Sequence, residues 1–238
     1  MLYDGRMQRF FVEPAAIGAS FVTIKDAALL HQMNAVLRMK TGSRFVALDG
    51  KGVEYECAIE IMKKDEARAA IIEKRENASE PALHVTLYQA MPTKIELFEF
   101  VLQKCTEIGV SEFVPMITER TERKDITKQE RLARIVREAA EQSGRGIIPS
   151  VRGIVDFDAA LREKSIILHE HGDFPLLSKI APELKNQKSL RIFIGPEGGF
   201  TEGEIERAKL AGALVASLGP RILRTETAAV AAASLVLL

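Results

Sequence analysis

The spacing of hydrophobic and polar residues changes at about residue 75. Before that point, short segments alternate apolar and polar positions and are rich in β-branched and aromatic side chains, as half-buried strands are. The strands predicted in this part are 9–12, 20–24, 44–49, 53–61 and 68–74. One helix interrupts them, from about Asp26 to Leu37, with its apolar residues on a single face. Short strands with one helix predict a small β-barrel.

After residue 75 strands alternate with helices, which predicts an α/β domain built on a parallel sheet. The strands expected there are 83–90, 112–117, 165–170, 190–195 and 214–219. The polar, turn-rich segment 75–81, which ends in a proline, separates the two patterns. We therefore predict two domains, a barrel over 1–74 and an α/β domain over 75–238.

Local signals refine the helices of the second domain. Three of them are expected to begin with a Thr-x-x-Glu capping box, at Thr93–Glu96, Thr127–Glu130 and Thr201–Glu204. The last helix, 227–238, is small or apolar nearly all round. A helix without a polar face must be buried, so we expect it to pack partly on its own sheet and partly on a second copy of the chain.

Composition excludes several classes of protein. The chain has 238 residues, of which 47% are hydrophobic and 28% charged, and its formal net charge is zero. It contains no apolar run of about 18 residues and no secretory leader, so a membrane protein is not expected. The two cysteines lie far apart in the sequence and the histidines form only a weak HxH pattern, so we predict no metal site. These features favour a cytoplasmic enzyme.

A glycine loop follows the strand 190–195 and is the first candidate for a binding site. Its sequence, GPEGG over 195–199, matches neither the GxGxxG nor the GxxxxGK pattern of phosphate-binding loops. Glu197 within the loop and the acidic start of the next helix would both repel an anion. A ligand with hydroxyls, ring nitrogens or positive charge would suit the loop better. The alternative is a tight β–α turn whose glycines serve backbone geometry only.

A second loop of similar design strengthens the case for a site. Residues 217–233 run from a strand through a Gly-Pro turn into a helix, and Arg221 and Arg224 frame an Ile-Leu pair after the turn. Two loops outside the carboxyl ends of parallel strands would line a crevice in an open α/β sheet. Alone, the two arginines read equally as ordinary surface residues.

Basic residues are concentrated between 120 and 152, where nine lysines or arginines face five acids. Arg131, Arg134 and Arg137 are three apart and therefore share one face of a predicted helix. Such a face is commonly no more than solvated surface. Beside loops that are poor phosphate cradles, it also suits contact with an RNA backbone.

Five segments resemble the ribosomal RNA small subunit methyltransferase E family, and the resemblance covers nearly the whole chain. They are GPEGGFTEGE (195–204), SLGPRILRTETA (217–228), QKCTEIGV (103–110), EQSGR (141–145) and MQRFFV (7–12). Because Met7 matches the usual start of the family, residues 1–6 read as an extension of unknown role. The resemblance implies an S-adenosylmethionine-dependent enzyme of the SPOUT superfamily that methylates N3 of a uridine in 16S ribosomal RNA. It also implies a PUA-like amino-terminal barrel, a carboxyl-terminal α/β domain with a trefoil knot, and a homodimer.

The resemblance assigns roles to individual residues. S-adenosylmethionine carries no phosphate, so Glu197 is expected to accept from a cofactor hydroxyl or to face its positive end. The positions expected to bind the cofactor are Leu168, Gly195, Pro196, Glu197, Gly198, Gly199, Leu218, Gly219, Ile222, Leu223, Thr227 and Ala228. The catalytic candidates are Arg145 and Arg224, which would stabilise the uracil anion, and Glu226 as the base. The residues expected on RNA phosphates are Arg9, Arg120, Arg123, Arg131 and Arg134.

Two other functions remain open at this stage. The first is a non-catalytic RNA-binding protein with the barrel as its module, although a pure binder has no need of intact glycine loops. The second is an enzyme that uses another adenosine cofactor on a small molecule, although the basic face and the additional barrel count against it.

Overall fold

The computed structural model describes residues 7–126, 129–162 and 164–238, and its contacts divide the chain into two compact units. One unit contains the chain up to Glu80 together with Ala140–Ile148. The other contains Pro81–Ala139 and Pro149–Leu238. The proposed capping box at Thr127 lies outside the described residues, as do residues 1–6.

The first unit is built on a five-stranded sheet with the order β1-β3-β4-β5-β2. Its strands are β1 (Gln8–Phe11), β2 (Phe21–Ile24), β3 (Arg44–Leu48), β4 (Val53–Met62) and β5 (Ala67–Glu76). Strand β1 pairs parallel with β3, and the remaining pairs are antiparallel. A 3-10 turn, η1 (Pro14–Ala16), joins β1 to β2. The linear order leaves β1 and β2 at the two edges of the sheet.

The predicted helix of this unit is present in two parts. Helix α1 (Ala27–His31) begins after Asp26, whose Oδ1 accepts a hydrogen bond of 2.7 Å from the Leu29 amide. It continues as a π-helical turn, η2 (Gln32–Val36). Leu30 and Met33 from this segment join the apolar core of the sheet, beside Phe45. The apolar face seen in the sequence is thus the face that packs.

The second unit contains a parallel sheet, as the alternation of strands and helices predicted. Its strands are β6 (His84–Ala90), β7 (Glu112–Ile117), β8 (Ser150–Val151), β9 (Val155–Asp156), β10 (Ser165–Leu168), β11 (Ser189–Ile194) and β12 (Leu214–Ala216). The order is β12-β10-β11-β6-β7-β8, with β9 also paired to β7. The carboxyl ends of β10, β11 and β12 are therefore neighbours, and the loops after them can share one site.

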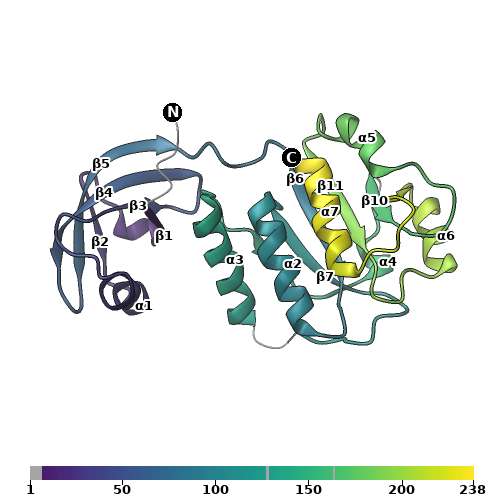
Figure 1. Ribbon diagram of the computed structural model, residues 1–238, viewed down its shortest axis with the longest axis horizontal. Coiled ribbons are helices and arrows are strands. Elements are labelled where there is room, and N and C mark those ends of the chain that lie inside the picture. Colours follow the sequence, from purple (N-terminus) through teal and green to yellow (C-terminus); the bar gives the residue numbers. More distant parts are fainter. Residues whose placement is uncertain (1–6, 127–128, 163) are drawn as a thin grey trace. The chain divides into compact units, whose positions relative to one another are not determined.

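Six helices accompany this sheet (Figure 1). They are α2 (Ile95–Ile108), α3 (Gln129–Ser143), α4 (Phe157–Ala160), α5 (Leu177–Leu184), α6 (Glu202–Leu210) and α7 (Thr225–Leu237). Helix α3 crosses from the second unit into the first at Ala140. Helix α7 packs against both α2 and α5, and Figure 1 shows α2 and α7 side by side.

The two capping boxes that can be compared with the sequence have different outcomes. At α6 the box is complete: the Thr201 hydroxyl accepts from the Glu204 amide, and the Glu204 carboxylate accepts from the Thr201 amide. At α2 the predicted box is wrong, because the N-cap is Lys94 and no side chain caps the helix. The hydroxyl of Thr93 donates instead to Glu197.

Helix α7 buries one face within the chain. The buried positions are Thr225, Ala229, Ala232, Ala233 and Val236. Thr227 is exposed, the other residues between them are half-buried, and the terminal Leu238 is 80% exposed. The chain alone thus does not cover the helix all round. Among the described residues no helix is long and apolar enough to cross a membrane.

Candidate functional site

A cavity of about 390 Å³ lies in the second unit at the carboxyl ends of three neighbouring strands. The segment 168–170 after β10 forms one wall, and the glycine loop 194–200 after β11 forms a second. The third wall is the segment 217–228, which contains the Gly-Pro turn and the first turn of α7. The cavity is therefore lined by both loops that the sequence singled out.

The structure brings together ten of the twelve positions expected to bind the cofactor. Those that line the cavity are Leu168, Gly195, Pro196, Glu197, Gly199, Leu218, Gly219, Ile222, Leu223 and Ala228. Gly198 and Thr227 are not among the lining residues. A Cβ atom on Gly198 would lie 3.3 Å from Cδ of Arg120, so this glycine faces an arginine and not the cavity.

Two glycines of the lining have backbones that favour glycine. Gly219 has a φ of +116°, and an added Cβ would meet nothing within 4 Å. Gly199 has a φ of +68°, and its Cβ would lie 2.6 Å from Oε1 of Glu170. Side chains are strained at such φ values. Gly219 leaves open space where a ligand can approach the backbone, whereas Gly199 makes room for a carboxylate.

Glu197 has a hydrogen-bond partner within the chain. Its Oε1 accepts 2.9 Å from the Thr93 amide and 2.6 Å from the Thr93 hydroxyl. Burial raises the pKa of this carboxyl, but the hydrogen bonds from Thr93 outweigh burial and hold the pKa below its usual value. That Glu197 also accepts from a cofactor hydroxyl or faces the positive end of the cofactor stays a prediction. Glu197 fastens the glycine loop to the segment before α2.

A second connection ties the glycine loop to α7. The hydroxyl of Thr225, the first residue of α7, donates to the carbonyl oxygen of Gly195 at 2.6 Å. The hydroxyl oxygen of Thr225 in turn accepts from Nε2 of Gln89 in β6 at 2.8 Å. Thr225 is 5% exposed and Gln89 is 0% exposed, so both hydrogen bonds are shielded from water.

Charged groups of both signs line the cavity. Arg224 and Glu226, two of the catalytic candidates, lie there on either side of Thr225, together with Arg221 and Glu170. Sequence reasoning missed several lining residues, which are Leu97, His169, Glu170, Ile194, Phe200, Ser217 and Thr225. Most of them directly adjoin a strand end or a predicted position, and that adjacency was the available signal. Burial lowers the pKa of His169 and favours its neutral form.

Comparison with known proteins identifies the family. An RNA methyltransferase domain model matches residues 79–237, and an RNA methyltransferase PUA domain model matches 35–72. Ribosomal RNA small subunit methyltransferase E of Bacillus subtilis is 33% identical over 93% of each chain. The protein of the same name from Synechocystis is 35% identical, over 92% of this chain and 74% of its own.

This chain belongs to the ribosomal RNA small subunit methyltransferase E family. A solved structure agrees: the Neisseria gonorrhoeae enzyme of that name, bound to S-adenosyl methionine, is 31% identical, with a TM-score of 0.85. The alignment covers 96% of this chain and 95% of that one. The predicted family is therefore confirmed, and with it the class of enzyme, an RNA methyltransferase with a PUA domain.

Two residues expected to act on RNA in this family member are buried within the first unit. Arg145, predicted to be catalytic, is 3% exposed, and its Nη2 lies 2.8 Å from Oε2 of Glu80. Arg9 lies 2.7 Å from Oε2 of Glu54, and its side chain is 8% exposed. Neither guanidinium is a freely exposed group of the kind that phosphate contacts use.

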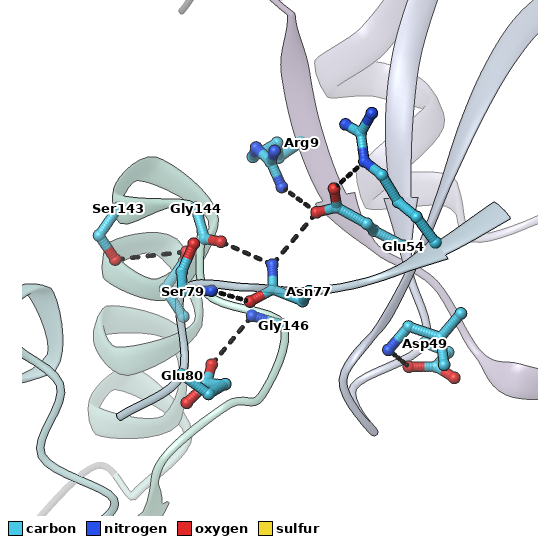
Figure 2. Close-up of polar contacts among 12 residues, drawn as sticks. Arg9, Asp49, Glu54, Asn77, Ser79, Glu80, Ser143, Gly144 and Gly146 are labelled. Atoms are coloured by element: carbon cyan, nitrogen blue, oxygen red, sulfur yellow. Dashed lines mark hydrogen bonds and ion pairs between the residues drawn. The ribbon is translucent and has the colours of Figure 1, made fainter. Parts of the chain in front are cut away.

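Figure 2 shows the polar network that connects Arg9 with the turn after α3. Glu54 accepts hydrogen bonds from Arg9, Arg75 and Asn77. Asn77 also donates to the carbonyl oxygen of Gly144 at 2.9 Å. The network joins β4, the segment after β5 and the turn after α3, which explains why 140–148 belongs to this unit.

The other four arginines expected on RNA lie on the second unit. Arg120 donates to the Gly198 carbonyl at 2.6 Å, and Arg123 donates to the Thr93 carbonyl at 3.2 Å. On α3, Nε of Arg131 lies 2.6 Å from Glu99, and Nε of Arg134 lies 3.7 Å from Glu138. Arg120 and Arg123 thus contact the loops around the cavity, whereas the two α3 arginines form surface ion pairs.

Proposed function

We propose that this chain transfers a methyl group from S-adenosylmethionine to N3 of a uridine in the 16S ribosomal RNA of the small subunit. The observation that carries the proposal is the cavity between the two glycine loops of an RNA methyltransferase domain. The proposal specifies the type of nucleotide, a uridine, and not its position in the RNA.

The residues of the cavity fit this cofactor. The open space beside Gly219 lets the flat adenine of the cofactor approach the backbone, where amides and carbonyls can form hydrogen bonds with its edges. The carboxylates of Glu170 and Glu226 suit a cationic ligand and disfavour a phosphate. Apolar contacts come from Leu168, Leu218 and Leu223.

Methyl transfer to N3 requires groups that accept a proton and stabilise the resulting negative charge, in a site that excludes water. When bound, S-adenosylmethionine supplies a methyl group on a positively charged sulfur. The imide at N3 is a weak acid, so Glu226 is proposed to accept its proton. Arg224 is proposed to lie beside a uracil oxygen, where its guanidinium stabilises the anion that remains. A dry cavity strengthens both interactions, because opposite charges attract more strongly at low dielectric.

RNA binding is proposed to involve the arginines outside the cavity. Arg134 and Arg131 are the candidates on α3, because exposed ion pairs are worth little and can be exchanged for phosphate contacts. Arg120 and Arg123 are proposed to contact RNA beside the glycine loop. Arg9 and Arg145 can do so only if their ion pairs with Glu54 and Glu80 open.

We also propose three features of the fold and of the assembly. They are a PUA-like barrel in the first unit, a trefoil knot of the SPOUT type in the second, and a homodimer in which the half-exposed face of α7 forms an isologous contact. Light scattering tests the dimer: a fully active monomer at micromolar concentration would contradict it. A ribosomal RNA substrate implies a cytoplasmic enzyme.

One two-step experiment tests the function. S-adenosylmethionine is titrated into the purified protein by calorimetry, and radiolabelled methyl transfer is then assayed on small ribosomal subunits and on naked 16S RNA. We expect cofactor binding and incorporation of label into RNA. RNA binding without cofactor binding would indicate a non-catalytic RNA-binding protein. Cofactor binding without transfer to either RNA would favour a small-molecule substrate.

A further inference from the structure

A buried chain of hydrogen bonds connects three segments of the second unit at the cavity. Gln89 lies near the carboxyl end of β6, Gly195 directly follows β11, and Thr225 begins α7. Gln89 Nε2 donates to Thr225 Oγ1 at 2.8 Å, and that hydroxyl donates to the Gly195 carbonyl at 2.6 Å. Gly195 and Thr225 line the cavity, whereas Gln89 does not.

The direction of each hydrogen bond in the chain is fixed by the Gln89 amide. A side-chain amide nitrogen can only donate, so Thr225 Oγ1 must accept from it. The other N–H of this amide is used by the Ala90 carbonyl, at 2.9 Å. A hydroxyl has a single proton, and the proton of Thr225 is thus left for Gly195. The Gln89 amide therefore orients the Thr225 hydroxyl toward the Gly195 carbonyl, and Thr225 binds the glycine loop.

This arrangement is not what stability alone would favour. Gln89 is 0% exposed, and its Oε1 has no hydrogen-bond partner. Burial of an acceptor without a partner destabilises the folded state. A methionine of similar size would fill the same space without an unpaired polar atom. The amide of Gln89 thus lowers the stability of the fold. Apart from its hydrogen bond to Ala90, its contact is the hydrogen bond to Thr225.

We propose that Gln89 is a positioning residue of the methyltransferase site, which acts through Thr225. By orienting the Thr225 hydroxyl, it holds the glycine loop and the first turn of α7 at the separation that S-adenosylmethionine requires. Because Arg224 and Glu226 flank Thr225 in the same turn, it also fixes the backbone that carries both catalytic candidates. This inference rests on the proposed function.

The test compares cofactor affinity with stability. For Gln89→Met we expect about ten-fold weaker binding of S-adenosylmethionine by calorimetry, because the Thr225 hydroxyl is no longer oriented. A loss of this size corresponds to roughly one hydrogen bond. The melting temperature without cofactor should be unchanged or higher, since the unpaired oxygen is gone. A merely structural glutamine predicts the reverse, a lower melting temperature with wild-type affinity.

Thr86→Val is the matched control. Thr86 lies on the same strand, is 7% exposed and donates to Glu112 at 3.3 Å, and it does not line the cavity. Loss of its hydroxyl should leave the affinity for S-adenosylmethionine unchanged. An equal loss in both variants would show that any polar change on β6 disturbs the site, and would overturn the proposal.

A double-mutant cycle tests whether Gln89 acts through Thr225. Thr225→Val should weaken cofactor binding, and Thr225→Ser should restore most of that loss because it keeps the hydroxyl. In the Thr225→Val background, Gln89→Met should change the affinity by less than about two-fold. Independent, multiplicative losses would overturn the proposal, as would no rescue by serine.

The outcomes also separate this inference from the proposed function. A wild-type protein that does not bind S-adenosylmethionine would overturn the function, and this inference with it. Wild-type affinity in Gln89→Met overturns the inference alone. If Gln89→Met does not fold, the comparison of Thr225→Val with Thr225→Ser still decides whether the hydroxyl holds the site.

Discussion

The carboxylate of Glu197 accepts two hydrogen bonds from Thr93, one from its amide and one from its hydroxyl. A glutamate between the proline and the glycine of a ligand-binding loop is thus explained by an intramolecular contact. It attaches the loop after β11 to the segment that precedes α2, and one cavity wall is fixed by it. The negative charge of Glu197 does not disfavour the proposed ligand, because this cofactor is a cation.

The first prediction follows from this contact. Glu197→Ala should weaken the binding of S-adenosylmethionine by about ten-fold, because the glycine loop loses two hydrogen bonds, both charge-assisted. Thr93→Val removes one donor and should give a smaller loss. Glu202→Ala, an exposed acid in the first turn of α6, is the control and should bind normally. Unchanged affinity in Glu197→Ala would show that the contact does not shape the cavity.

The second prediction concerns the approach of the cofactor to the backbone. Gly219→Ala should reduce cofactor affinity, since its methyl group enters the open space of the lining, and should cost about 1 kcal/mol of stability because of the φ of +116°. Gly42→Ala is the matched control: φ is +89°, its Cβ would also meet open space, and Gly42 is not in the lining. The control should lose stability and keep its affinity. Equal cofactor affinity in the two variants would refute the assignment of Gly219.

The third prediction concerns RNA binding by α3. Replacement of Arg131 and Arg134 by alanine should weaken RNA binding and flatten its dependence on salt, because fewer counterions are released from the RNA. The cofactor affinity should not change. Since Arg131 is paired closely with Glu99, the single change at Arg134 should account for at least half of the effect. The salt dependence of the RNA affinity decides the question, and an unaltered slope would mean that these arginines are only solvated surface.

The fourth prediction concerns pH and the polar network of the first unit. Burial raises the pKa of Glu54, but hydrogen bonds from Arg9, Arg75 and Asn77 outweigh it and lower the pKa from 4.5 to about 2. A carboxyl whose pKa is lower in the folded state stabilises the fold above its unfolded pKa. That contribution, at most roughly 3 kcal/mol, should disappear as the pH falls from about 5 to 2.

Denaturant unfolding at several pH values measures this contribution. The free energy of unfolding of the wild-type protein should fall over that range, and Glu54→Gln should show a lower and flatter profile. Parallel profiles for the two proteins would show that another carboxyl is responsible for the acid sensitivity.

Patterns in the sequence predicted most of the secondary structure and most of the cavity. The alternation of strands with helices is enough to place glycine loops at strand ends, because parallel strands all end at one edge of the sheet. That geometry is local and singles out both loops, and ten of the twelve positions that the family resemblance implied for the cofactor line the cavity. Gly198 shows the limit: its neighbour Arg120 comes from the turn after β7, and nothing in the loop sequence indicates which way the glycine faces.

Long-range partners account for what the sequence could not predict. Thr93 carries a good capping signal, yet a carboxylate 104 residues away binds its hydroxyl. The segment 140–148 continues a helix of the second unit, yet it belongs to the first because Asn77 and Glu80 bind its backbone. Arg9 and Arg145 are of a residue type that often contacts RNA, but the carboxylates of Glu54 and Glu80 in the same unit pair with them. Each of these acids is distant in the sequence from the group that it binds.

The most direct test of the account is to determine where the methyl group is attached. Small ribosomal subunits that lack the modification are incubated with the protein and S-adenosylmethionine labelled in its methyl group, and the RNA is digested to nucleosides for mass spectrometry. The account predicts labelled 3-methyluridine, formed by the wild-type protein and lost in Arg224→Ala. Label in any other nucleoside, or none in RNA from a protein that binds the cofactor, would contradict it.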